Sequence, residues 1–292
     1  MPTKTREPAR IRVRKTYKLY VGGAFPRSES GRVYPVSSVK GELLAHAAQA
    51  SRKDLRDAVV AARAAFKGWS SATGYNRGQV LYRVAELLDG RRDQFAAEVS
   101  AAEDLAPADA LAIVDSAIDR WVYYAGWTDK YAQVAGGTNP VAGPYFNFSL
   151  PEPAGVVGVF APQDSSLLGL VSVLAPVVAT GNTAVLIASQ DHPLPAVSLT
   201  EVLATSDLPG GVVNLLTGFT AELAPWLASH RDVNAVDLTG VAPADRRDLE
   251  LKAADNVKRV YVPGATDWTA DPGTSRLGFF TETKTVWHPI GV

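Results

Sequence analysis

The sequence has no cysteine among its 292 residues, so disulfides, thiolate metal sites and cysteine nucleophiles are excluded. Its histidines lie far apart and lack the paired spacing of zinc ligands, so no metal site is expected. Basic and acidic residues nearly cancel, with 29 Lys and Arg against 30 Asp and Glu, and this balance gives no general attraction for nucleic acid. The four histidines are His46, His192, His230 and His288.

The sequence also lacks a long apolar run. The longest, from Leu167 to Ala179, is interrupted by Ser172 and Pro176 and is too short to cross a bilayer. The start of the chain has no apolar core like that of a signal peptide, and we therefore expect a cytoplasmic protein without a membrane segment. Residues 1–16 form a basic tail. A solvated terminus is the simpler interpretation of this tail, and an arm for nucleic acid or an acidic protein is the alternative.

What the sequence does have is a regular alternation of short β-branched runs and longer apolar segments after residue 154. This alternation is typical of a parallel sheet whose strands are joined by helices, so the fold class is α/β with a Rossmann-like, five-stranded sheet. Ligands of such sheets bind at the carboxyl ends of the strands. The predicted strands are Val156–Ala161, Thr183–Ala188, Val212–Thr217, Ala235–Thr239 and Arg259–Pro263, with helices near 167–180, 194–206, 220–229 and 243–255.

The residues before this region predict short strands followed by three helices. Residues 17–48 contain extended runs and glycine turns. Apolar residues at intervals of three and four then predict a helix from Lys53, a second over about 77–99 and a third over about 108–131. Ser51 with Asp54 resembles a capping box at the start of the first helix.

Two further segments are expected to pair with each other. Residues 134–153 are punctuated by Gly and Pro and favour an exposed antiparallel hairpin, and Phe280–Trp287 favours a Thr-rich terminal strand. An isolated hairpin is marginally stable, and an open terminal strand invites association. We therefore expect the two segments to form one small antiparallel sheet.

Many phrases in order resemble the aldehyde dehydrogenase superfamily along nearly the whole chain. The resemblance implies a dinucleotide-binding domain at residues 17–132 and 154–264, and bridging, oligomerisation strands at 133–153 and 276–292. It also implies a catalytic domain with a nucleophilic cysteine, whose place in this chain is taken by a short linker after Pro263. The matching phrases are LYVGGAF, AVVAARAAFKGW, YYAGWTDK, PYFNFSLPEPAGVVGVFAP, APVVATGNTAVLIAS, DLPGGVVNLLTG and the later LTG.

The residues that match the family's oxyanion site differ from it. The family has Pro-Trp-Asn after the first strand, and this chain has Pro162-Gln163-Asp164. A carboxylate at Asp164 would repel a developing oxyanion. We interpret Asp164 as the N-cap of the next helix, and a general acid or base is the alternative. Ser165 and Ser166 lack the G-x-S-x-G setting of a serine nucleophile.

The resemblance also implies a degenerate cofactor site at Ser189, Gln190, Gly218 and Gly240. These positions match the residues that hold the adenosine ribose, leave room for the adenine and begin the phosphate-binding turn. Ile187 replaces the family's ribose-binding Lys, whereas Gln190 retains a hydrogen-bonding group.

Two other replacements weaken the match further. Val241 replaces the Ser of the family's Thr-Gly-Ser, and Asp245 stands where a second Gly would let backbone amides approach a phosphate. Pro263 stands at the position of the general-base Glu and has no group that transfers a proton.

Because the nucleophile, the oxyanion amide and the general base are all absent, no catalytic residue is assigned, and the pattern indicates a pseudoenzyme. The leading hypothesis is a structural or regulatory subunit that forms a homo-oligomer, or a hetero-oligomer with a full-length aldehyde dehydrogenase, through residues 133–153 and 276–292. No cofactor, nucleic acid or membrane partner is expected. The alternatives are a regulator with weak NAD(P) or adenine-nucleotide binding, and a residual NAD-dependent aldehyde oxidoreductase.

Overall fold

The computed structural model describes residues 15–291. The basic tail expected at residues 1–16 therefore lies outside the described residues, apart from its last two positions. Within the described part of the chain, no helix is both long and apolar enough to cross a membrane.

The body of the molecule is built on the predicted parallel sheet of five strands, in the order β7-β6-β5-β8-β9. Neighbouring strands are parallel throughout. The side chains of the first four strands are fully buried, as β-branched runs covered on both faces should be. The strands are β5 (Val156–Phe160), β6 (Thr183–Ile187), β7 (Val213–Leu216), β8 (Ala235–Asp237) and β9 (Arg259–Tyr261).

Helices cover both faces of this sheet. One face packs against α6 (Leu168–Ala179) and α7 (Leu194–Leu203), and helices from the first half of the chain form a second layer outside these two. That outer layer consists of α2 (Gly74–Asp89), α3 (Arg92–Glu103) and α4 (Pro107–Trp127). The other face packs against α1 (Arg52–Ser71), α8 (Thr220–Ser229) and α9 (Pro243–Ala254).

The predicted single helix over 77–99 is wrong. The structure has two helices there, because α2 ends at Gly90 and α3 begins again after Arg91. Both helices bury residues in the same core, so the apolar periodicity continues across the break. The sequence pattern therefore gave no sign of the break. The prediction of strand from residue 276 is also wrong at its start, because residues 275–279 form a short helix, α10 (Ser275–Phe279), before the terminal strand.

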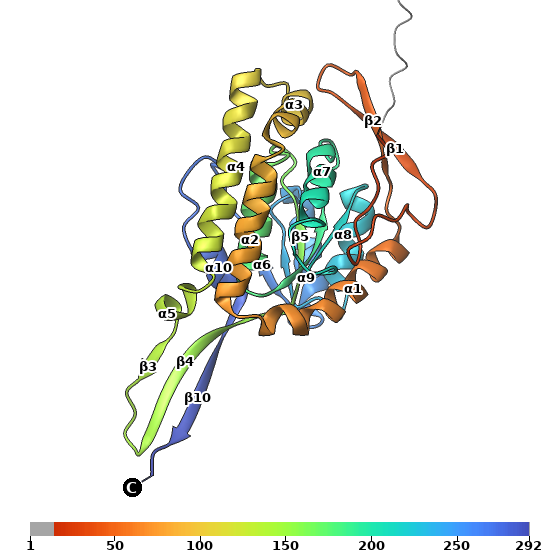
Figure 1. The fold of residues 1–292 in the computed structure, drawn as a ribbon. Coiled ribbons are helices and arrows are strands. Elements are labelled where there is room, and N and C mark those ends of the chain that lie inside the picture. The colour runs from red at the N-terminus through yellow and green to blue at the C-terminus, as the bar shows by residue number, and fades with distance from the viewer. Residues whose placement is uncertain (1–14, 292) are drawn as a thin grey trace, which may run out of the picture.

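The first strands form an antiparallel hairpin of β1 (Val33–Ser37) and β2 (Leu43–Ala48). Its turn contains Gly41, whose φ of 83° is in the left-handed region that glycine adopts without strain. The segment before the hairpin reaches the large sheet, because Tyr20 and Leu215 exchange backbone hydrogen bonds of 3.0 and 2.7 Å. The hairpin lies against the body (Figure 1), where its Tyr34 and Val36 pack with Leu194 of α7.

The predicted pairing of the hairpin with the terminal strand is confirmed. β3 (Gly137–Asn139), β4 (Tyr145–Pro153) and β10 (Thr281–Pro289) form one antiparallel sheet in the order β10-β4-β3. This sheet projects from the body together with the C-terminal end of the chain (Figure 1), and we call it the arm. Its root is fixed by the Phe280 carbonyl, which accepts hydrogen bonds from the Ala154 amide at 3.1 Å and from the Asn182 side chain at 2.9 Å.

The predicted capping box at the start of α1 is also confirmed. The Ser51 hydroxyl accepts from the Asp54 amide, and the Asp54 carboxylate accepts from the Ser51 amide at 2.8 Å. The same carboxylate accepts from the Ser28 hydroxyl at 2.7 Å and from the Glu29 amide at 3.1 Å. One buried side chain therefore joins the helix to the chain segment that precedes the hairpin.

The substitution Asp54→Ala should lower the free energy of unfolding by about 2–3 kcal/mol, because it leaves three donors without their acceptor. Asp57→Ala on the same helix is the matched control. Within residues 15–291, Asp57 pairs only with exposed Lys53 and Arg56, so the control should cost about 0.5 kcal/mol or less. Urea denaturation of the two variants measures the difference, and equal losses would contradict the role given to Asp54.

Candidate functional site

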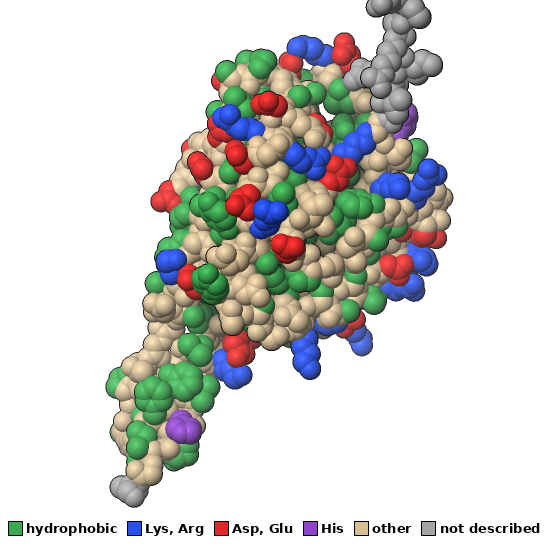
Figure 2. Space-filling model, in the orientation of Figure 1, with side chains coloured by type: hydrophobic (Ala, Val, Ile, Leu, Met, Phe, Trp, Pro, Cys, Tyr) green, Lys and Arg blue, Asp and Glu red, His purple; other side chains and the backbone are tan. Residues whose placement is uncertain are grey.

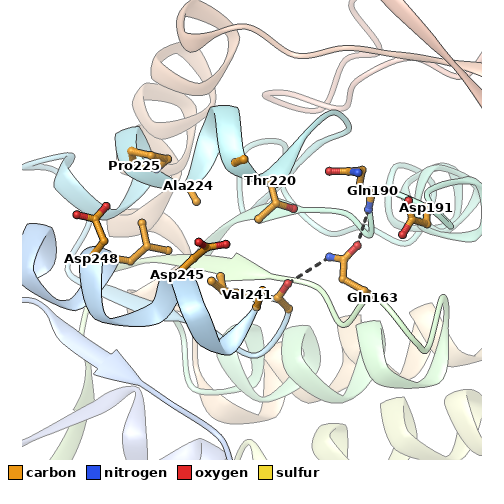
Figure 3. A pocket seen from close by; sticks show the side chains of 13 residues that line it. Gln163, Gln190, Asp191, Thr220, Ala224, Pro225, Val241, Asp245 and Asp248 are labelled. Atoms are coloured by element: carbon orange, nitrogen blue, oxygen red, sulfur yellow. Dashed lines mark hydrogen bonds between the residues drawn. The ribbon is translucent and has the colours of Figure 1, made fainter.

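The candidate site lies at the carboxyl edge of the large sheet, around the end of its central strand. Beyond β5, the chain continues to one face of the sheet, whereas its neighbour β8 continues to the other face. Parallel sheets bind ligands at such a switch point. A cavity of about 360 Å³ opens here between the N-terminal turns of α8 and α9 (Figure 3), and we call it the edge cavity.

Gln163 joins three strand ends across the floor of this cavity. Its amide nitrogen donates to the carbonyls of Ala161 at 3.1 Å and Gly240 at 3.3 Å, and its amide oxygen accepts from the Gln190 backbone at 2.9 Å. The segments after β5, β6 and β8 are thereby tied by one side chain (Figure 3). The sequence identified Gln163 only as a replacement in the oxyanion motif, and its bridging role depends on strands far apart in the chain.

The structure brings Ser189 and Gln190 to this edge, but the two side chains have different positions. Ser189 is buried, and its hydroxyl accepts from the His192 amide at 3.1 Å, so it stabilises the turn after β6. The Gln190 side chain lines the edge cavity. Ile187, at the position of the family's ribose-binding Lys, is buried in the core beneath them.

Backbone packing explains the presence of both candidate glycines without a ligand. A Cβ atom on Gly240 would lie 1.8 Å from the Ala161 carbonyl oxygen, so only glycine fits between β5 and β8 at this point. Gly218 has a φ of 143° and packs against the Ala50 backbone, where an added Cβ would lie 3.2 Å from the amide nitrogen. Both glycines are required by backbone packing, whatever the edge cavity binds.

The charges around the edge cavity are of one sign. Asp191, Asp245 and Asp248 line it, and its described lining contains no lysine or arginine. The nearby Arg246 donates instead to the backbone carbonyls of Val241 at 3.1 Å and Pro263 at 3.2 Å. A pyrophosphate would meet carboxylates where it needs donors and positive charge, so this lining does not fit the phosphates of a dinucleotide.

The predicted N-cap role of Asp164 is wrong. The Ser165 hydroxyl instead accepts from the Gly169 amide at 2.9 Å in the first turn of α6, and Asp164 makes no capping bond. Ser166 is also held in place, because its backbone amide and its hydroxyl both donate to Glu103 at 2.6 Å. The two serines thus have structural partners, and neither contacts a histidine that would activate it.

A buried ion pair that the sequence did not reveal lies beside this edge. Arg276 of α10 donates to the Asp237 carboxylate and, at 3.1 Å, to the Thr239 hydroxyl. Asp237 is fully buried, and burial raises its pKa, although the Arg276 guanidinium and the Thr239 donors oppose that rise. Arg276 also lies 4.6 Å from the ring centre of Tyr261. An aspartate inside a buried β-branched strand was the only sequence signal for such a partner.

The linker after Pro263 is held by a second arginine. Arg120 of α4 is buried, and it donates to the carbonyls of Trp268 at 2.9 Å and Ala270 at 3.1 Å. The linker therefore returns along the body and delivers α10 to the sheet edge. Glu250 lies on α9 and is not among the residues that line the edge cavity.

The substitution Arg276→Met should lower the free energy of unfolding by about 3–5 kcal/mol, because it leaves the Asp237 carboxylate buried without a cation. Arg259→Met is the matched control, since Arg259 forms an exposed pair with Glu282, and it should cost about 1 kcal/mol or less.

The pH dependence of the Arg276→Met variant gives an independent check. Without Arg276, the folded-state pKa of Asp237 rises further above its unfolded value. The folded state then takes up a proton before the unfolded state does. The difference in unfolding free energy between the variant and the wild type should therefore become smaller as the pH falls from about 8 to about 5. Urea denaturation at several pH values measures it, and a deficit that is independent of pH would contradict a charged Asp237.

Comparison with known proteins agrees with this architecture. The sequence pattern of the aldehyde dehydrogenase family matches residues 25–264. Benzaldehyde dehydrogenase of Antirrhinum majus is 33% identical over 260 residues, which are 87% of this chain and 48% of that protein. Cytosolic aldehyde dehydrogenase 1 of Elephantulus edwardii is 31% identical over 256 residues, which are 86% of this chain and 50% of that protein.

Solved structures give the same result. The NAD⁺ complex of an aldehyde dehydrogenase from Bacillus cereus superimposes with a TM-score of 0.79 at 26% identity, over 84% of this chain and 50% of that one. HpcC from Thermus thermophilus also gives 0.79, at 30% identity over 84% and 47%. The chain thus spans about half the length of the relatives that it matches. By sequence and by fold, it belongs to the aldehyde dehydrogenase family.

Proposed function

We propose that this chain is a non-catalytic member of its family that works by assembly. It would act as a structural or regulatory subunit, either with copies of itself or with a full-length active aldehyde dehydrogenase. The observation that carries the proposal is the arm, which presents an apolar face and open strand edges. The lining of the edge cavity supports the non-catalytic part, and we expect no resident cofactor there.

One face of the arm carries an apolar cluster centred on Phe148, flanked on β10 by Lys284 and His288. The register places Val286 opposite Phe148, and Phe146 and Leu150 flank Phe148 on the same face of β4. Phe146 is 47% exposed and Leu150 is 42% exposed. Figure 2 shows hydrophobic side chains gathered on the projecting arm. Contiguous apolar surface of this kind marks an interaction site.

The opposite face of the arm carries a hydrogen-bonded polar cluster beside the exposed rings of Tyr145 and Trp287, which lie 5.7 Å apart. The Asn139 amide donates to Asn147 at 2.6 Å and to Ser149 at 2.9 Å, and Ser149 hydrogen-bonds Thr285 at 2.9 Å. These cross-strand bonds hold the three strands in register without help from the body. The arm therefore has a defined shape to offer to a partner.

The double substitution Phe146→Ser with Leu150→Ser should weaken assembly about a hundredfold or more, because each apolar side chain contributes about 1.5–3 kcal/mol when buried. Tyr75→Ser with Tyr82→Ser is the matched control. Both tyrosines are exposed on α2 of the body, and their loss should leave assembly unchanged.

Light scattering after size exclusion, over a range of concentrations, measures self-assembly, and co-expression with a full-length aldehyde dehydrogenase measures capture. A chain that stays monomeric at every concentration and captures no such partner would contradict the proposal. Genuine assembly that survives the arm variant would place the interface elsewhere and would also contradict it.

A second candidate function is a nucleotide-binding regulator, and the persistence of the edge cavity favours it. The acidic lining of the same cavity, however, predicts that no nucleotide binds. Titration calorimetry with NAD, NADP, ATP or ADP at about 1 mM should give no binding heat, because three carboxylates line the cavity and would repel a phosphate.

The variant Asp245→Asn with Asp248→Asn removes two of these charges and should gain measurable nucleotide binding. Glu250→Gln lies on the same helix outside the cavity lining, and it controls for net charge. Binding to the unmodified chain would support the regulator instead. Formation of NADH from an aldehyde by the purified chain would overturn the non-catalytic proposal.

A further inference from the structure

A groove of about 700 Å³ lies between the start of α1 and the end of α8, and we call it the basic groove. Among the described residues, the groove and the edge cavity have no lining residue in common. α1 begins on the side of the body away from the arm (Figure 1), so the groove is also a separate surface from the arm. Its described charged lining consists of Arg52, Lys53, Arg56, Arg231 and one carboxylate, Glu29.

Neither the composition of the chain nor the stability of α1 accounts for this concentration of positive charge. The whole chain has a net charge of −1 at pH 7. Arg52 and Lys53 stand in the first turn of α1, where the helix dipole disfavours cations, so these two charges do not stabilise the helix. His230 adds no charge near neutral pH, because burial lowers the pKa of its imidazole below the ordinary value.

Two of the four cations have no carboxylate partner within residues 15–291. Lys53 and Arg56 share Asp57, at 2.9 and 3.1 Å, whereas neither Arg52 nor Arg231 forms an ion pair in that part of the chain. Both unpaired arginines have exposed side chains, so an anionic group from another molecule can reach them. The groove therefore offers two accessible positions for carboxylates.

An exposed tryptophan adds an apolar contact beside these charges. Trp226 lies on α8 and is 42% exposed. The Arg52 guanidinium lies 3.6 Å from the centre of the Trp226 ring, within the range of a cation–π contact. A guanidinium stacked on a ring keeps its N–H donors in its own plane, where they can bind a carboxylate as a pair. Tryptophan and arginine are also the residues that most often dominate binding energy at protein interfaces.

The arrangement of these groups favours an extended acidic chain over a small ion or a nucleic acid. Arg52 and Arg56 are one helical turn apart on α1, and Arg231 follows α8, so the cations come from two elements. A single small anion would leave part of this charge unpaired. A single-stranded nucleic acid stacks successive bases on several rings, and the described lining contains no tyrosine or phenylalanine beside Trp226.

We propose that the basic groove binds an acidic segment of a partner protein, in which an apolar side chain is flanked by glutamates or aspartates. Carboxylates of the segment pair with Arg52 and Arg231, and the apolar side chain packs against the exposed part of the Trp226 ring. The charges speed association and select the partner, while the tryptophan contributes affinity. This binding does not depend on the arm or on the proposed assembly.

The test uses the full chain and a fluorescein-labelled peptide, acetyl-EEDLEED-amide, with labelled acetyl-QQNLQQN-amide as the uncharged control. Fluorescence anisotropy at about 50 mM salt should show saturable binding of the acidic peptide, with a Kd of about 0.1 mM or below. The control peptide should not bind. Binding of the acidic peptide should weaken at about 300 mM salt, because salt screens exposed charges.

Arg52→Glu with Arg231→Glu reverses the two cations that have no carboxylate partner in the described chain, and it should weaken binding about tenfold or more. Lys67→Glu with Arg247→Glu is the matched control. Both control residues are exposed and lie outside the lining of the groove, so the same change in net charge should alter binding less than about twofold. A urea midpoint close to that of the wild type checks that each variant is folded.

A double-mutant cycle tests the contact with the tryptophan. Trp226→Ala should weaken binding of the acidic peptide about tenfold, and replacement of the peptide's leucine by serine should do the same to the wild type. The two changes together should weaken binding by much less than the product of the single effects, because they remove the same contact. Independent effects would contradict that contact.

Three further results would count against the proposal. The first is the absence of saturable binding of the acidic peptide, and the second is equal binding by the groove variant and its matched control. The third is tighter binding of oligothymidylate or inorganic phosphate than of the peptide, which would make the groove a nucleic-acid or small-anion site. The arm variant Phe146→Ser with Leu150→Ser should bind the peptide as the wild type does, so failure of either proposal can be told from failure of the other.

Discussion

The buried pair of Asp237 and Arg276 holds the end of the chain to the sheet. Asp237 ends strand β8 inside the core, and Arg276 arrives from a short helix almost forty residues later. A carboxylate in such a position is tolerated only with a cation and further donors, which Arg276 and Thr239 supply. Because α10 leads directly into β10, the pair also fixes where the arm leaves the body. The position of the arm therefore depends on the same ion pair that lies beside the sheet edge.

The sheet edge has the strand arrangement of a ligand site, but the charged side chains that line its cavity are all acidic. Gln163 occupies the floor and binds three strand ends, and carboxylates line the cavity above it. Both features are compatible with a stable fold, and the carboxylates work against the phosphates of a dinucleotide. Selection for stability alone would retain Gly240 and Gly218, since backbone packing requires both of them. Their presence is therefore weak support for a cofactor site.

The arm exposes large apolar side chains to solvent. Phe146 and Leu150 on one face of the arm are each more than 40% exposed, and Trp287 on the opposite face is 58% exposed. A sheet of three strands with one apolar face gains most of its stability by covering that face. Assembly is the physical outcome that this geometry favours, and it is the basis of the proposed function.

The elements whose signal is local could be predicted from the amino-acid sequence. The β-branched runs predicted the five parallel strands, and Ser51 with Asp54 predicted the cap of α1, because burial and capping act over a few neighbouring residues. The break between α2 and α3 was missed, since the apolar period continues across Gly90.

The side chains that meet at the sheet edge could be identified only from the folded chain. The bridging by Gln163 and the pairing of Asp237 with Arg276 both depend on segments distant in sequence. Periodicity reports which face of an element is buried, but it does not encode which distant segment covers that face. The tertiary packing therefore decided which side chains line the edge cavity.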